Sequence, residues 1–140
     1  MKIEVVKERL QHMKRALDEL KSMRKIERKD FLGDTRLQWS VERGFQIICE
    51  AVFDIGNHIL VGKFSLAPSN YQSIIDELAK KGIITDELNK HFSGLGGFRN
   101  ILVHDYMEID AEEVYAKLKD RLGDFDMFIR EVVGWLKEEG

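Results

Sequence analysis

The chain has 140 residues, of which 44% are hydrophobic and 34% charged, and its net charge is −3. These values are typical of one soluble globular domain with long exposed helical faces. The single cysteine, Cys49, excludes an intramolecular disulfide, and one proline with two threonines favours helices over turn-rich sheets.

Charge is unevenly spread along the chain. Residues 1–30 carry ten Lys/Arg against six Asp/Glu, whereas residues 31–140 carry twelve against nineteen. A basic first segment can attract RNA phosphates, lie against an acidic partner, or form a solvated helical face. The sequence has no 18-residue apolar run and no apolar segment near its start, so we expect a cytoplasmic protein without a signal peptide or membrane contact.

The apolar pattern predicts two long helices in the first half of the chain. Over residues 3–29, apolar side chains recur at spacings of three and four, which is typical of an amphipathic helix. A second helix begins near Asp34 or Thr35, since either side chain can cap it. This helix is apolar on more than one face, so we expect it at the centre of a bundle or between a bundle and a dimer face.

The glycines of the second half divide its helical pattern. A short helix is predicted over residues 69–81, with Gly82 at its C-cap, and the next begins at Thr85. Three glycines fall in the middle of this next helix: Gly94, Gly96 and Gly97. Because each glycine costs a helix about 1 kcal/mol relative to alanine, we expect a kink or the close approach of another backbone there.

A last helix is predicted from about Asp110 onward, and this completes the fold class. The sequence contains about five helical segments and no alternating pattern typical of strands. We therefore predict an all-α domain, with an up-and-down helical bundle as its simplest topology.

The most informative stretch is residues 99–106, which read Arg-Asn-Ile-Leu-Val-His-Asp-Tyr. A histidine such as His104 can move a proton near neutral pH, and the guanidinium of Arg99 can hold a phosphate with two donors. Asn100 and Tyr106 add polar groups beside them. These side chains suit a metal-free cleavage of a phosphodiester, in which the RNA 2′-hydroxyl attacks the adjacent phosphate.

Helical geometry restricts how these groups can meet. At about 100° per residue, Arg99 and His104 lie about 140° apart around one helix. We therefore expect that one straight helix does not bring them onto a single phosphate. A break near the glycines, or a second copy related by a two-fold axis, would bring them together.

The stretch from Phe98 to Tyr106 resembles the Arg-x4-His-x-Tyr signature of the HEPN superfamily, in its HepT-like toxin branch. Residues 50–58 are also similar to the long second helix of that family, and the helix lengths agree over most of the chain. The resemblance implies one HEPN-like helical domain over residues 1–140 that forms a homodimer.

The resemblance also implies a function. It implies a metal-independent endoribonuclease toxin without a cofactor, which cleaves RNA at a dimer cleft and is paired with an MntA-type minimal nucleotidyltransferase antitoxin. Arg99 and His104 match the catalytic pair of the family, and Asn100 matches the polar position after the arginine. Tyr106 matches the tyrosine to which the antitoxin attaches AMP. The alternative is a non-catalytic helical partner or substrate-binding domain of a nucleotidyltransferase, and the intact Arg99/His104 pair favours the nuclease.

One further polar pattern lies on the second helix. Glu50, Asp54 and His58 are spaced four apart and share one helical stripe. Such a stripe can bind a metal ion, but the Glu-x-x-His pattern of di-iron sites is absent from the sequence. We therefore predict no metal site, and interpret the stripe as polar support beneath Arg99 or His104 or as a seam at a dimer interface. A pair between Asp54 and Arg99 is the contact we expect.

Overall fold

The computed structural model describes residues 1–104 and 106–139, with only the backbone of Tyr106, and this part of the chain is helical without any strand. Its helices are α1 (Ile3–Ser22), α2 (Arg28–Leu32), α3 (Thr35–Phe64), α4 (Tyr71–Lys80), α5 (Asp86–His91), α6 (Leu95–His104), α7 (Ala111–Asp120) and α8 (Leu122–Glu139). A 3-10 turn, η1 (Tyr106–Glu108), lies between α6 and α7. The all-α prediction is confirmed, although the first, fourth and last predicted segments are each divided in two.

The predicted helix starts are confirmed by their caps. The side chain of Asp34 accepts a hydrogen bond from the Leu37 amide, and Thr85 accepts one from the Leu88 amide. Asp110 caps α7 in the same way. The C-cap of α4 is Lys81, one residue before the predicted Gly82, whose φ of 74° is the left-handed conformation that commonly follows the end of a helix.

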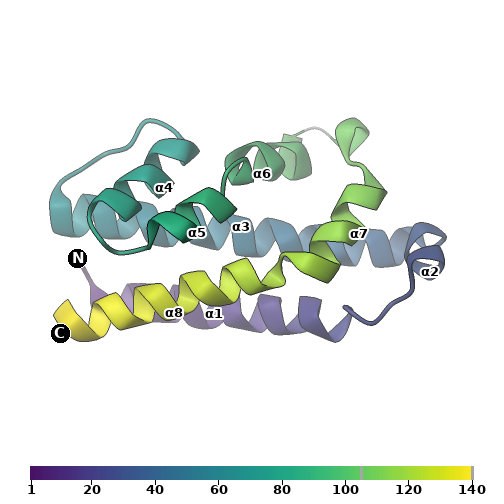
Figure 1. The fold of residues 1–140 in the computed structure, drawn as a ribbon, viewed down its shortest axis with the longest axis horizontal. Helices are drawn as coiled ribbons and strands as arrows, with labels where there is room; N and C mark the ends of the chain where they lie inside the picture. The colour runs from purple at the N-terminus through teal and green to yellow at the C-terminus, as the bar shows by residue number, and fades with distance from the viewer. Residues whose placement is uncertain (105, 140) are drawn as a thin grey trace.

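The helices pack around α3, which is 30 residues long. Figure 1 shows α1 and α8 running side by side in opposite directions along one side of α3, with α4, α5 and α6 on the other side. Both chain ends lie at the same end of the bundle. The helix that carries the signature therefore sits across α3 from the α1–α8 pair.

The divided first segment has a packing explanation. α1 ends at Ser22, and the chain turns before α2 begins at Arg28. There the hydroxyl of Tyr115 in α7 donates to the Ile26 carbonyl at 2.7 Å, and the Tyr115 ring lies 5.4 Å from the buried Phe31. The prediction of one continuous helix over residues 3–29 is therefore wrong at its C-terminal end, because the chain turns after α1 and α2 packs over α7.

An aromatic cluster holds α6 against the bundle. The ring of Phe45 in α3 lies 5.7 Å from Phe98 in α6 and 6.5 Å from Phe125 in α8. Phe92, just after α5, lies 5.5 Å from Phe125. Such aromatic contacts stabilise by about 0.5–1.5 kcal/mol each beyond area burial, so they fix the position of the helix that begins the signature.

By length and composition, α3 is apolar enough to cross a membrane, with a mean hydropathy of 1.2 over its best window. However, 56% of that window is buried inside the bundle. Its hydrophobicity is thus explained by packing, as for any central helix apolar on several faces.

Candidate active site at the end of helix α6

Glycines determine how α6 approaches the bundle. Gly94 has a φ of 83°, which separates α5 from α6 just before Leu95. A Cβ atom at Gly96 would lie 2.7 Å from Cβ of Tyr71, so only glycine lets α6 pack this closely on α4. The kink and the close approach that we expected from this glycine run are thus both present, at different glycines.

The close packing of α6 on α4 places Arg99 over the aromatic ring of Tyr71. The guanidinium carbon of Arg99 lies 5.2 Å from the centre of the Tyr71 ring, within the range of a cation–π contact. The Tyr71 ring is itself supported by Phe53, with ring centres 4.4 Å apart. Only 18% of the Arg99 side chain is exposed, so this cation is largely held by the protein.

A carboxylate of α3 also contacts the guanidinium of Arg99. Nη2 of Arg99 lies 3.5 Å from Oε1 of Glu50, and the same oxygen accepts a hydrogen bond from Gln46 at 3.2 Å. The polar stripe on α3 therefore supports Arg99 as expected, but through Glu50. The expected pair between Asp54 and Arg99 is wrong, because α6 crosses α3 one turn earlier, and Asp54 instead lines a small hollow with Arg9 and Arg43.

Arg99 and His104 meet within one chain. Nη1 of Arg99 lies 3.4 Å from Nε2 of His104 and 3.2 Å from Oδ1 of Asn100. Our expectation that one straight helix keeps Arg99 and His104 apart is therefore wrong. The break at Gly94 precedes both residues and does not explain the contact; the length of the arginine side chain does, since it reaches around the helix.

This contact has a chemical consequence for His104. A guanidinium has only donors, so Nε2 can accept from it only in the neutral imidazole with its proton on Nδ1. A neutral imidazole is the form that takes a proton from a hydroxyl group. The His104 side chain is exposed, so a substrate can reach it, but the lone pair of Nε2 is occupied as long as the contact with Arg99 is made.

The other sequence-predicted residues lie in different situations. Asn100 is exposed and touches Arg99. His58 is half-buried, and its Nε2 has no hydrogen-bond partner among the described residues. Within the part of the chain that the structure describes, no three His, Cys, Asp or Glu residues gather as metal ligands. The backbone of Tyr106 lies in η1, but the prediction about its side chain falls outside what the structure describes.

Sequence reasoning missed the part played by Tyr71. The sequence-based hypothesis gives Tyr71 no role, yet the face of its ring contacts the guanidinium of Arg99. The only signal was Gly96, which marks a close approach without naming the residue that approaches.

Comparison with known proteins identifies the family of the chain. Residues 13–132 match the family described as HepT-like, ribonuclease HepT-like. The tRNA nuclease HepT of Aphanizomenon flos-aquae is 34% identical over 133 residues, which cover 94% of this chain and 90% of the relative. The mRNA nuclease HepT of Shewanella oneidensis is 36% identical over 99 residues, or 71% of this chain and 74% of the relative.

A solved structure extends the likeness to three dimensions. The tri-AMPylated HEPN toxin of Shewanella oneidensis, in complex with its MNT antitoxin, superposes with a TM-score of 0.84 at 29% identity. The match covers 96% of this chain and 99% of that one. This chain therefore belongs to the HepT-like ribonuclease family of HEPN proteins.

Proposed function

We propose that this protein is the endoribonuclease toxin of a HEPN/MNT toxin–antitoxin pair, and that Arg99 and His104 cleave RNA without a metal ion or cofactor. The observation that carries the proposal is the 3.4 Å contact between Arg99 Nη1 and His104 Nε2, at the exposed end of α6. The naming of two relatives as tRNA and mRNA nucleases supports the same reading.

The proposed reaction follows from these two side chains. When the guanidinium of Arg99 turns from Nε2 of His104 to the phosphate, Nε2 of the neutral imidazole takes the proton of the RNA 2′-hydroxyl, whose oxygen attacks the adjacent phosphorus. The guanidinium of Arg99 stabilises the extra negative charge on the phosphorane oxygens. The 5′-oxygen then leaves with a proton, which a histidine supplies, and the products are a 2′,3′-cyclic phosphate and a 5′-hydroxyl end.

A homodimer is the assembly that we propose for this reaction. The face of α3 away from the core carries Trp39, 65% exposed, and Val61, 48% exposed, so large apolar side chains remain uncovered there. A second copy of the chain would cover such residues and bring a second His104 to the cleft. Two histidines would then divide the roles of base and acid.

The antitoxin part of the proposal concerns Tyr106. We propose that a minimal nucleotidyltransferase attaches AMP to this tyrosine, two residues after His104. The added nucleotide would place a negative charge and a bulky group beside Arg99, and so exclude RNA by repulsion and by volume. The tri-AMPylated HEPN toxin among the structural relatives supports this assignment of chemistry.

The nuclease is tested with purified protein, mixed tRNA and mRNA, and EDTA in the buffer. Wild-type protein should produce 2′,3′-cyclic ends, and His104→Ala should slow cleavage by about 10²- to 10⁴-fold. Arg99→Ala should slow it by about 10²- to 10³-fold. His91→Ala and Arg130→Ala are matched controls, because both residues are exposed and lie outside the site.

Two outcomes would contradict the proposal. Equal RNA cleavage by wild type and His104→Ala would remove the nuclease, and so would an equal loss in the His91→Ala control. The modification has a separate readout: with the cognate nucleotidyltransferase and ATP, intact mass should show added adenylyl groups on wild type and none on Tyr106→Phe. Adenylylation of a protein that leaves RNA intact would instead favour the non-catalytic partner.

A further inference from the structure

A hollow lies on the side of the bundle opposite the candidate active site. It runs between α1 and α8 and has a volume of about 770 Å³. Figure 1 shows α3 between this pair of helices and α6, so the hollow and the Arg99–His104 pair face different directions. A ligand in this hollow leaves the candidate active site accessible.

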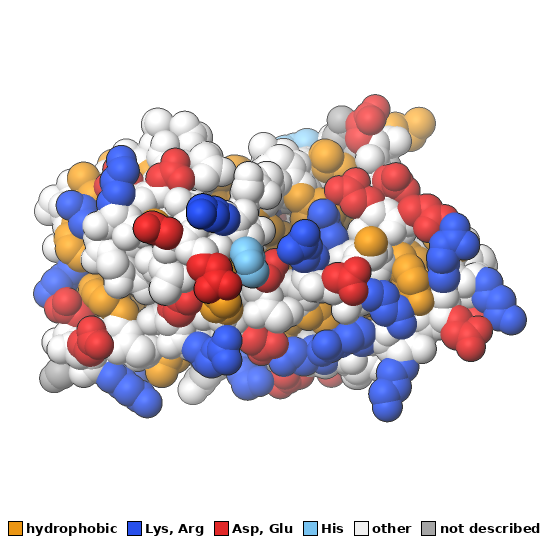
Figure 2. Space-filling model, in the orientation of Figure 1, with side chains coloured by type: hydrophobic (Ala, Val, Ile, Leu, Met, Phe, Trp, Pro, Cys, Tyr) orange, Lys and Arg blue, Asp and Glu red, His pale blue; other side chains and the backbone are white. Residues whose placement is uncertain are grey.

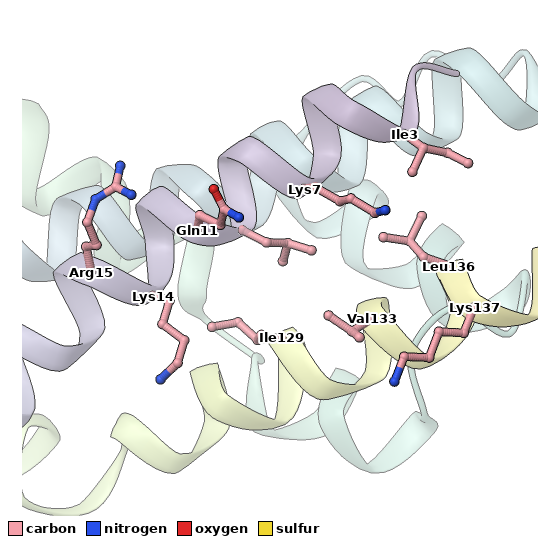
Figure 3. A pocket seen from close by; sticks show the side chains of 10 residues that line it. Ile3, Lys7, Gln11, Lys14, Arg15, Ile129, Val133, Leu136 and Lys137 are labelled. Carbon is pink, nitrogen blue, oxygen red and sulfur yellow. The ribbon is translucent and has the colours of Figure 1, made fainter. Parts of the chain in front are cut away.

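The floor of the hollow is aliphatic. Figure 3 shows Ile3 of α1 and Ile129, Val133 and Leu136 of α8 directed into the gap between the two helices. Three of these four, Ile3, Ile129 and Val133, are only half-buried in this chain. No aromatic side chain is among the described residues that line the hollow, so it offers no platform on which a nucleic acid base would stack.

The rim of the hollow is basic. Lys7 and Lys14 of α1 and Lys137 of α8 hold their ammonium groups along its margins, and Arg15 lies at one end. No carboxylate is among the lining residues that the structure describes. Lys14 pairs with Asp18, but none of the ion pairs found in the described residues involves Lys7, Arg15 or Lys137.

This charge contrasts with the rest of the molecule. The chain as a whole carries a net charge of −3, whereas the rim carries four cations and no anion among described residues. Figure 2 shows Lys and Arg side chains, with Asp and Glu side chains among them, along the edge where α1 and α8 lie. An acidic ligand would therefore be attracted to the rim of the hollow.

The dimensions of the hollow match a helix. From Ile3 to Arg15 the α1 edge extends over about 18 Å, which is the length of about three helical turns. The aliphatic residues of α8 recur at spacings of four and three, so they form the ridges into which a third helix packs. Two antiparallel helices with an apolar seam provide the groove of helix-in-groove recognition.

We infer that the groove between α1 and α8 binds an amphipathic helix of a partner protein, with an apolar stripe on the floor and Asp or Glu side chains against the basic rim. The aliphatic floor argues against RNA. A second copy of the chain that entered the groove with the α3 face around Trp39 would place its Arg36 and Arg43 against the basic rim, and these like charges would repel one another. This inference does not depend on RNA cleavage by Arg99 and His104.

The test uses the full-length protein and a labelled 18-residue helical peptide with leucines at i, i+4 and i+7 and glutamates on both flanks. Fluorescence anisotropy should show binding that weakens with salt, and a peptide with lysine in place of each glutamate should bind at least about tenfold more weakly. The double variant Lys7→Glu/Lys137→Glu should lose about tenfold or more in affinity. Val133→Asp, which places a carboxylate on the half-buried floor, should lower the affinity for the peptide to a similar extent.

A matched control separates the groove from net charge. Lys25→Glu/Lys90→Glu makes the same charge change at exposed positions outside the groove, and should bind the peptide like wild type. Circular dichroism confirms that each variant is folded. Equal binding of the glutamate and lysine peptides, no binding of the glutamate peptide, or an equal loss in the control would each overturn the inference. A change in RNA binding, vesicle binding or oligomeric state in the rim variant, with peptide affinity unchanged, would overturn it in favour of another occupant.

Discussion

The two sides of α3 hold their cations in opposite ways. On the α6 side, Arg99 contacts a carboxylate, an aromatic face, an amide oxygen and an imidazole, and it is largely buried. On the α1–α8 side, Lys7 and Lys137 are exposed above an aliphatic floor and pair with no described carboxylate. The first arrangement fixes one charge in one place, as catalysis requires. The second attracts a ligand without fixing its position, as docking requires.

Among the changes that test how the two sides hold their cations, the largest effect is expected from removing the carboxylate that contacts Arg99. Glu50→Gln takes away the charge opposite Nη2, so the guanidinium loses its fixed position beside His104. We expect RNA cleavage to slow by up to about 100-fold, since small misplacements of a catalytic group have effects of that order. Glu113→Gln, which removes a pair between the exposed Glu113 and the half-buried Lys117, should cleave like wild type. An equal rate for Glu50→Gln and wild type would show that Glu50 does not position Arg99.

The contact of α6 with α4 is tested by two neighbouring glycines. Gly96→Val forces side-chain atoms against Tyr71, and we expect a loss of about 1–3 kcal/mol in the free energy of unfolding. Gly97→Ala meets nothing within 4 Å, and should instead stabilise the helix by about 0.5–1 kcal/mol. Urea unfolding measures both. If the two variants shift stability in the same direction, α6 does not pack on Tyr71 as described.

The aromatic platform under Arg99 should contribute less. Tyr71→Phe keeps the ring face, whereas Tyr71→Leu removes it, and a cation–π contact of this kind is worth about 0.5–2 kcal/mol. We therefore expect Tyr71→Phe to cleave RNA within about twofold of wild type, and Tyr71→Leu about tenfold more slowly. An equal loss in Tyr71→Phe and Tyr71→Leu would assign the role to the hydroxyl group, which both variants lack.

Part of the fold and of the candidate site could be predicted from the sequence, and part could not. The caps at Asp34, Thr85 and Asp110 were predictable, because a capping side chain bonds an amide only two or three residues away. The breaks before Arg28 and at Arg121 were not, since no proline or left-handed glycine marks them. The partner of Arg99 was predicted on the right helical stripe but one turn away, because the crossing point of two helices depends on contacts that no single helix encodes.

The smallest effect concerns Glu42, where half-burial raises the pKa of the carboxyl group. The folded state then binds this proton more tightly than the unfolded state. The stability it contributes is present below the ordinary pKa of a glutamate and is lost as the pH rises through the raised value. Glu42→Gln should therefore raise the Tm by about 1–2 °C at pH 7, and the difference should vanish in acid. The exposed Glu138→Gln should show no such pH dependence.

The shortness of α6 gives the candidate active site a dynamic character. α6 has ten residues, with Gly96 and Gly97 in its first turn, and only Phe98 and Leu102 are buried, whereas eleven residues of α3 are buried. In hydrogen exchange, the amides of α6 should lose their protection at a lower opening free energy than those of α3. The arginine and histidine thus lie on a segment that should open more easily than α3, and a ligand that orders or loosens α6 would switch them together while the bundle beneath stays folded.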